Sequence, residues 1–224
     1  MEWFLEYGET RLKVVCDKDL RSESLGHLVF LYDQLVHYIN RNPLFKSSYE
    51  PVEVGNDAPD IVRVMAEAAA QADVGPMASV AGAFSQLVGE FLVGMGASDV
   101  VVDNGGDIYL RLDKEKVVRV YAGESPLSGS VSLRVKPGET PVGVCTSSGS
   151  VGPSISLGEA DAATVVADSA VLADAAASAV GNEVRGPDGI ESGFERAGKV
   201  SGIRGVIVIA CGRVGFWGNL PEMV

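Results

Sequence analysis

Residues 143–182 read GVCTSSGSVGPSISLGEADAATVVADSAVLADAAASAVGN, and the rest of the chain is interpreted outward from them. The stretch combines a Cys-Thr-Ser-Ser-Gly segment with an alanine-rich segment, and it contains no Lys or Arg. Three aspartates, Asp161, Asp168 and Asp174, lie in this apolar context. Because such a composition is unusual for a surface connection, the sequence predicts the functional site here.

On the N-terminal side of this stretch, apolar runs and turn residues alternate. Asn104-Gly105-Gly106 between β-branched runs predicts a hairpin over 98–112, because both central residues of such a turn can adopt a positive φ. The other strands predicted in this part of the chain are at 3–7, 11–16, 117–121, 131–136 and 142–145, with a candidate short strand at 52–54. Three helices are predicted: one at about 20–39 capped by Asp17 or Asp19, one capped by Asp57 that runs to about Gln71, and an apolar one at 77–95 that packs against a sheet.

On the C-terminal side, Asp168-Ser169 is the predicted N-cap of a helix from Ala170 to Val180. A mostly irregular segment with a short helix at about 192–197 follows, and then a buried strand at 205–210 that pairs with 213–217. Because strand-rich and helix-rich segments interleave throughout, we expect an α+β fold, a mixed α/β sandwich, in which residues 1–224 form a single domain.

Composition narrows the classes of protein and partner. With 46% hydrophobic and 21% charged residues, the 224-residue chain is typical of a compact globular protein. A net charge of -12 without a basic block disfavours nucleic acid as a partner. Three widely spaced cysteines without a CxxC pair predict neither disulfides nor a zinc site and favour the cytoplasm. We expect no signal peptide, because the N-terminus carries Glu2 and Glu6 in place of a basic stretch and an apolar run. We expect no membrane partner, because Asp168 and Asp174 interrupt the most apolar segment, 162–181. Monomer and homo-oligomer both remain open.

The small polar segment Thr146, Ser147, Ser148 and Gly149 follows a predicted strand. Hydroxyls and exposed main-chain N–H groups in such a loop can surround a phosphate without Lys or Arg. A plain structural turn is the alternative that this segment alone favours.

Asp174 lies inside the predicted helix, with Ser178 one turn later on the same face. A carboxylate and a hydroxyl together suit a hard cation such as Mg²⁺, which prefers oxygen ligands. An exposed aspartate on a surface helix is the simpler alternative.

Cys145 begins the small polar segment. Its thiol could act as a nucleophile or carry a persulfide if a neighbour lowered its pKa. No His is near it in sequence, so a buried small apolar side chain is the alternative.

Several segments together resemble the ApbE-like superfamily, whose best-known members are Mg²⁺-dependent FAD:protein FMN transferases. The matching segments, in the family's order, are Ala78 within GPMASVAG, Asn104-Gly105-Gly106-Asp107-Ile108, Thr146-Ser147-Ser148-Gly149, Val165 to Ala170, and Ala173-Asp174-Ala175-Ala176-Ala177-Ser178. They lie within about 75–182, and the match is nearest to a small, uncharacterised prokaryotic branch of the superfamily.

The resemblance implies an α+β fold and a site that binds Mg²⁺ beside the pyrophosphate of FAD or a related flavin nucleotide such as FMN. It assigns the metal to Asp174, Ser178 and the Ala78 carbonyl, and the small phosphorylated ligand to the matching segments at 104–107 and 146–149. The chain departs from the transferases at three places: Ser79 replaces a Lys, Ser178 replaces a Thr, and Gly152 to Leu157 replaces a His-x-Ile-Asp-Pro segment. The transferases' long N-terminal flavin-binding segment has no evident counterpart.

The leading hypothesis is therefore Mg²⁺-dependent binding of a phosphorylated ligand, with FMN transfer as an open question. Two alternatives belong to other classes. One is a sulfur-handling protein that carries a persulfide on Cys145 in sulfur assimilation. The other is a binding module with the same fold and no catalysis.

Overall fold

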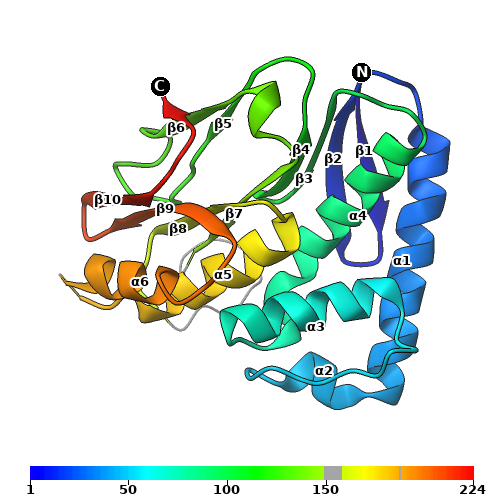
Figure 1. Ribbon diagram of the computed structural model, residues 1–224, viewed down its shortest axis with the longest axis horizontal. Helices are drawn as coiled ribbons and strands as arrows, with labels where there is room; N and C mark the ends of the chain where they lie inside the picture. The colour runs from blue at the N-terminus through cyan, green and yellow to red at the C-terminus, as the bar shows by residue number, and fades with distance from the viewer. Residues whose placement is uncertain (149–157, 187) are drawn as a thin grey trace.

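A computed structural model describes residues 1–148, 158–186 and 188–224. Its main feature is an antiparallel sheet of eight strands (Figure 1). In spatial order these strands are β1 (Glu2–Tyr7), β2 (Thr10–Cys16), β3 (Val100–Asn104), β4 (Asp107–Arg111), β7 (Val142–Ser147), β8 (Ala162–Ala167), β9 (Ile203–Ala210) and β10 (Arg213–Gly218).

A smaller sheet covers one face of the large one. Its strands are β11 (Glu222–Met223), β6 (Ser132–Val135) and β5 (Lys116–Arg119), and η2 (Pro137–Glu139) is a single turn after β6. Side chains alternate between the two faces of a strand. Accordingly Val144 and Val166 contribute to the core under the small sheet, whereas Cys145 and Val165 contribute to the core under the helices.

Helices form the layer on the opposite face (Figure 1). Along the chain α1 lies against β1, α4 against β3 and β4, α5 against β7 and β8, and α6 against β9. The helices are α1 (Arg21–Arg41), α2 (Pro43–Ser47), α3 (Asp60–Ala72), α4 (Val80–Gly94), α5 (Ala170–Glu183) and α6 (Gly189–Ala197), and η1 (Pro76–Ser79) is a single turn that leads into α4. The arrangement confirms the predicted α+β sandwich.

The predicted hairpin is confirmed. β3 and β4 pair from Val100 with Arg111 to Asn104 with Asp107. Gly105 and Gly106 form the turn with φ of +68° and +111°, values that a residue with a side chain rarely adopts. The hairpin therefore places Asn104 and Asp107 at the same end of the sheet.

The strand β8 was not predicted, although it lies in the middle of the large sheet. All six of its residues are buried, because helices cover one face and the small sheet the other. A strand buried on both faces loses the alternation of apolar and polar residues that identifies a strand in sequence. The segment 162–181 therefore contains a strand followed by a helix.

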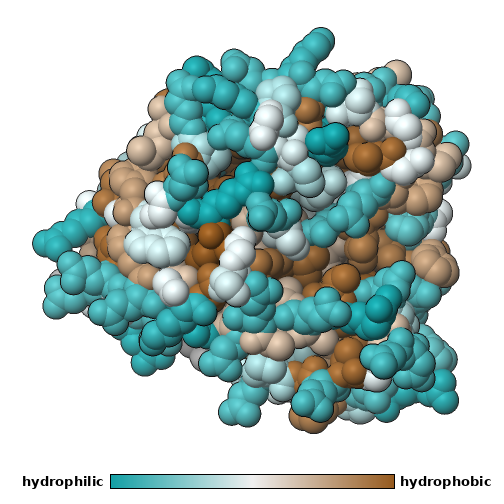
Figure 2. Space-filling model, in the orientation of Figure 1, coloured by the Kyte–Doolittle hydropathy of each residue, from teal (hydrophilic) through white to brown (hydrophobic). Residues whose placement is uncertain are grey.

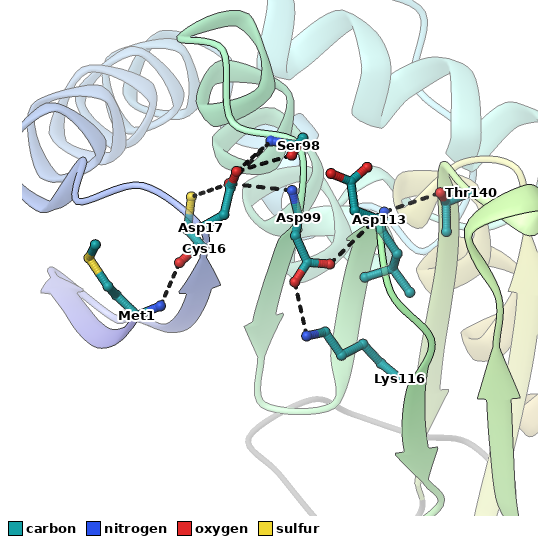
Figure 3. Close-up of polar contacts among 9 residues, drawn as sticks. Met1, Cys16, Asp17, Ser98, Asp99, Asp113, Lys116 and Thr140 are labelled. Carbon is teal, nitrogen blue, oxygen red and sulfur yellow. Dashed lines mark hydrogen bonds and ion pairs between the residues drawn. The ribbon is translucent and has the colours of Figure 1, made fainter.

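The predicted cap of the first helix was wrong. The N-cap of α1 is Leu20, and no side chain caps it. The Asp17 carboxylate instead accepts hydrogen bonds from the Ser98 and Asp99 N–H groups (3.1 and 3.3 Å), as Figure 3 shows. Asp99 in turn forms an ion pair with Lys116. These contacts tie β2 to the connection after α4, at the end of α4 remote from its N-terminus.

Two expectations between α2 and α3 were also wrong. The segment 52–54 is not a strand; Val52 and Val54 pack against the main core without pairing with a strand. Asp57 does not cap α3, which begins at Asp60 after the N-cap Pro59. Residues 52–54 are therefore held by packing against the core, and Pro59 takes the N-cap position predicted for Asp57.

Among the described residues, one helix, Pro76–Gly94, is long and apolar enough to span a membrane by length and composition alone. The core helix of a globular protein satisfies the same criterion. In this structure α4, which forms most of that span, packs against α1, α3 and α5. In Figure 2 hydrophilic residues cover most of the outline of this face, and hydrophobic ones show in its middle, where α4 and α5 lie.

Candidate functional site

Asp174 is buried where α5 meets the beginning of α4. Only 9% of the residue is exposed, so the alternative of an exposed surface aspartate was wrong. Its Oδ2 atom accepts a hydrogen bond of 2.8 Å from the N–H group of Gly82, in the first turn of α4. Because the first N–H groups of a helix have no partner within the helix, this carboxylate caps α4 from a residue 92 positions away.

Gly82 makes this close approach between the two helices possible. A Cβ atom at position 82 would lie 2.2 Å from the Ala170 carbonyl oxygen and 2.8 Å from the Cβ atom of Asp174. Gly143 plays the same part on the other side of α5, where a Cβ atom would lie 2.3 Å from the Cα atom of Ala170. Glycine is therefore required at position 82, where α4 approaches the first turn of α5, and at position 143, where β7 approaches the same turn.

The tip of the β3–β4 hairpin reaches the same place. The Asn104 side-chain amide donates to the Ala81 carbonyl oxygen at 3.3 Å. The Oδ1 atom of Asp107 accepts the Thr146 main-chain N–H at 3.3 Å. The structure therefore gathers Asn104 and Asp107 of the hairpin and Asp174 of α5 around the beginning of α4, although these three elements are distant in sequence.

The segment predicted as a polar loop is partly strand, because β7 continues to Ser147. Its side chains consequently point in different directions. The Thr146 hydroxyl pairs with that of Thr164 at 2.9 Å, and the Ser148 hydroxyl donates to the Asp161 carbonyl oxygen at 2.7 Å. Ser147 lies under α5 near Gly181. Gly149, with the segment 152–157 that departs from the transferases, lies outside the described residues.

Cys145 lies beside this group of carboxyls but is fully buried. Its Sγ atom donates to the Ala170 carbonyl oxygen at 3.3 Å. Burial, followed by the nearby Asp107 and Asp174, raises the pKa of the Cys145 thiol well above its usual value. A reactive cysteine needs a thiolate and access. The structure thus favours the alternative of a buried small side chain over a persulfide carrier.

Burial also raises the pKa of both carboxyl groups. The pKa of Asp107 rises to about 7, because its carboxyl group is poorly solvated and Asp103 lies nearby. The pKa of Asp174 rises well above its usual value, first through burial and then through the charge of Asp107; the Gly82 and Ala81 N–H groups oppose this rise. Without a positive partner, the buried Asp174 and the half-buried Asp107 therefore favour the protonated form.

No basic side chain in the described part of the chain forms an ion pair with Asp107 or Asp174. These same residues contain no group of three or more His, Cys, Asp or Glu side chains that could hold a metal. A cation here would therefore need a mixed set of carboxylate, hydroxyl and carbonyl oxygens. Such a set suits Mg²⁺, which usually keeps several waters as ligands.

The other two residues predicted to bind the metal lie on the helix of Asp174 or on an element in contact with it. Ser178 is half-buried one turn after Asp174 on α5. Ala78 is half-buried in η1, which packs against α5. Ser178 thus shares a helix face with Asp174, and Ala78 lies on an element in contact with that helix, so the chemistry of these residues fits an oxygen-ligated cation.

The remaining two aspartates of the stretch have separate roles. Asp168 does not cap α5; Ser169 does, through its Oγ atom and the Leu172 N–H. The exposed Asp168 carboxylate instead forms an ion pair with Arg204. Asp161 is half-buried and contributes its main-chain carbonyl to Ser148. The site therefore rests on one of the three aspartates, together with Asp107 from the hairpin.

The pH dependence of stability tests the protonation of this pair. Without a cation, the folded protein keeps a proton on Asp107 up to about pH 7, whereas the unfolded chain releases it at about pH 4. This contribution to the free energy of unfolding is complete below about pH 4 and is lost as pH rises to about 7, by at most about 1.4 kcal/mol per pH unit.

The measurement is urea unfolding in EDTA, at about pH 5 and about pH 7.5, of the wild type and Asp107→Asn. Asparagine keeps an acceptor for the Thr146 N–H but cannot titrate. The fall in stability should be smaller in Asp107→Asn. Equal falls in both proteins would show that Asp107 titrates normally.

Comparison with known proteins gives consistent results. The family model described as AbpE bacteria matches residues 2–197. A UPF0280 protein of Methanococcus maripaludis strain C6 is 46% identical over 194 residues, which cover 85% of this chain and 78% of the relative. A UPF0280 protein of Methanothermobacter thermautotrophicus strain Delta H is 46% identical over 222 residues, which cover 97% of this chain and 85% of the relative.

Two solved structures show the same fold at low sequence identity. The apo form of the flavinyl transferase ApbE of Pseudomonas stutzeri superposes with a TM-score of 0.62 and 13% identity, over 99% of this chain and 94% of that one. The apbe protein of Thermotoga maritima gives a TM-score of 0.59 with 11% identity, over 98% of this chain and 97% of that one. These two likenesses establish the architecture.

Proposed function

The chain belongs to the family described as AbpE bacteria, and we propose that it binds Mg²⁺ together with a small phosphorylated ligand, a flavin nucleotide such as FAD or FMN. The observation that carries the proposal is the pair of poorly solvated carboxyls, Asp107 and Asp174, without a basic partner among the described residues. A divalent cation is the partner that would let both carboxyls ionise.

In this proposal the cation is held by the Asp174 carboxylate, the Ser178 hydroxyl and the Ala78 carbonyl oxygen. Asp174 can cap α4 with Oδ2 and still offer its second carboxylate oxygen. When bound, Mg²⁺ supplies positive charge that neutralises phosphate oxygens. Residues 143–182 contain no Lys or Arg that could neutralise these oxygens.

The ligand is proposed to lie along the hairpin tip and the end of β7. Asn104 and Asp107 position this surface, because both are already bonded, to Ala81 and to the Thr146 N–H. Gly105 and Gly106 leave the tip without side chains, since a Cβ atom at either position would meet nothing within 4 Å. Main-chain approach to a phosphate is the use for which glycine is suited.

FMN transfer is a further step that this proposal keeps separate from binding. Ser79 stands at the position of the transferases' Lys, and it is buried with its hydroxyl donating to the Pro76 and Met65 carbonyl oxygens at 2.8 and 3.3 Å. The role of that Lys is therefore not taken over by Ser79. The proposal for this chain is binding, with transfer to a protein acceptor as the activity to assay once binding is found.

Calorimetric titration with FAD, FMN, ADP and pyrophosphate, each with Mg²⁺ and with EDTA, tests the proposal. We expect FAD to bind only with Mg²⁺, with an affinity that ADP and pyrophosphate share in part because the cation recognises phosphate. If no phosphorylated ligand binds in Mg²⁺ while the protein remains folded, the proposal fails. FAD binding that is equal in EDTA would remove the metal from it.

A further inference from the structure

Gln86 occupies a position on α4 that mirrors the position of Asp174 on α5. It lies one turn after Gly82, and its side chain reaches the beginning of α5. The Gln86 Oε1 atom accepts hydrogen bonds from the Ala170 N–H at 2.8 Å, the Val171 N–H at 3.3 Å and the Ser169 hydroxyl at 2.9 Å. A glutamine inside a helix gives no sequence signal of such a role.

The two helix starts therefore depend on each other. The first turn of α5 receives its acceptor from Gln86 on α4, and the first turn of α4 receives its acceptor from Asp174 on α5. The N-cap of α4, Ser79, provides no side-chain cap of its own. Each helix thus satisfies N–H groups that the other leaves without partners.

We propose that Gln86 is a positioning residue of the candidate site and forms, with Asp174, a mutual cap between α4 and α5. Movement of α5 that breaks the Gln86 contacts also withdraws Asp174 from Gly82, because both contacts lie within the first two turns of α5. Their loss is therefore coupled. The link to ligand binding rests on the proposed function, whereas the mutual cap itself does not.

Amide hydrogen exchange followed by NMR, in EDTA and without nucleotide, tests the mutual cap. Removal of a helix cap costs typically about 1 kcal/mol, so in Gln86→Ala we expect the protection factors of Ala170 and Val171 to fall about fivefold. The distinguishing readout is the Gly82 amide, which bonds to Asp174 and not to the Gln86 side chain, and which should lose protection with them. If Gln86 capped only α5, the protection factor of the Gly82 amide would not change in Gln86→Ala.

Two variants serve as controls. Gln86→Glu keeps an acceptor for the α5 amides; made together with Glu90→Ala, so that no second carboxylate lies against it, it should leave all three protection factors within about twofold of the wild type. Glu90→Ala removes the acceptor of the Gln86 Nε2 atom (2.9 Å) but leaves the Oε1 contacts, and it should also leave all three unchanged.

The reciprocal variant keeps the test decisive if Gln86→Ala does not fold. Asp174→Ala should lower the protection of the Ala170 and Val171 amides, which bond to Gln86 and not to the Asp174 carboxylate, and Asp174→Asn should not. Unchanged Gly82 protection in a folded Gln86→Ala, or unchanged Ala170 and Val171 protection in Asp174→Ala, would overturn the mutual cap. Because the experiment contains no cation or flavin, a failure of the proposed function would leave these results intact.

Discussion

Replacement of Asp174 by asparagine is expected to abolish Mg²⁺-dependent nucleotide binding while leaving the fold in place. Asparagine keeps a side-chain oxygen that can accept the Gly82 N–H, so the cap of α4 survives. It loses the negative charge that the cation needs. Removal of one partner of a buried ion pair costs about 3–5 kcal/mol, which corresponds to a loss of affinity of at least about 100-fold.

Calorimetry of FAD binding in Mg²⁺ measures this loss, with Asp168→Asn as the matched control. That variant removes the same charge six residues earlier, from an exposed side chain that pairs with Arg204. An exposed ion pair contributes at most about 1 kcal/mol, and FAD binding should not change. Wild-type affinity in Asp174→Asn would mean that Asp174 serves only as a cap.

Substitution of alanine for Gly82 is expected to destabilise the protein and to impair the same site. The added Cβ atom would meet the Ala170 carbonyl oxygen at 2.2 Å, and main chain cannot move aside as a flexible side chain can. The helices must then separate. Overpacking typically costs about 1–3 kcal/mol, and a clash with main chain belongs at the upper end; because alanine favours a helix by about 1 kcal/mol, we expect a net loss of up to about 2 kcal/mol.

Thermal unfolding gives the comparison, with Gly94→Ala on the same helix as control. Nothing lies within 4 Å of a Cβ atom at position 94, so this change should raise stability by up to about 1 kcal/mol. A chain of this size shifts by about 2–4 °C per kcal/mol, so the two variants should move in opposite directions by several degrees. If Gly82→Ala melts as Gly94→Ala does, α4 and α5 do not meet at Gly82.

Elements with a strong local signal were predicted from sequence, and those set by tertiary partners were not. The hairpin at Gly105 and Gly106 and the alanine-rich α5 follow from local conformational preference. β8 was missed because both of its faces are buried. Asp17 has the chemistry of a helix cap, but Ser98, 81 residues away, provides better-placed donors.

The same division applies to the candidate site. Asp174 was selected by its position in an apolar helix and by resemblance, and its burial agrees with that choice. Asp107 was expected to bind the cofactor, but its partnership with Asp174 depends on how the hairpin meets α5. The partners of Gly82 and Gln86 could not be predicted, because a contact between two helices 84 or more residues apart in sequence is not encoded in either helix alone.

The claim that Asp174 holds a divalent cation is tested most directly by a crystal structure with FAD and Mn²⁺ in place of Mg²⁺. Anomalous diffraction locates Mn²⁺ without reference to the ligand. We predict a peak about 2.0–2.2 Å from the Asp174 carboxylate oxygen that does not bond to Gly82, close to Ser178. A peak elsewhere, or none at saturating Mn²⁺ and FAD, would contradict the proposed site.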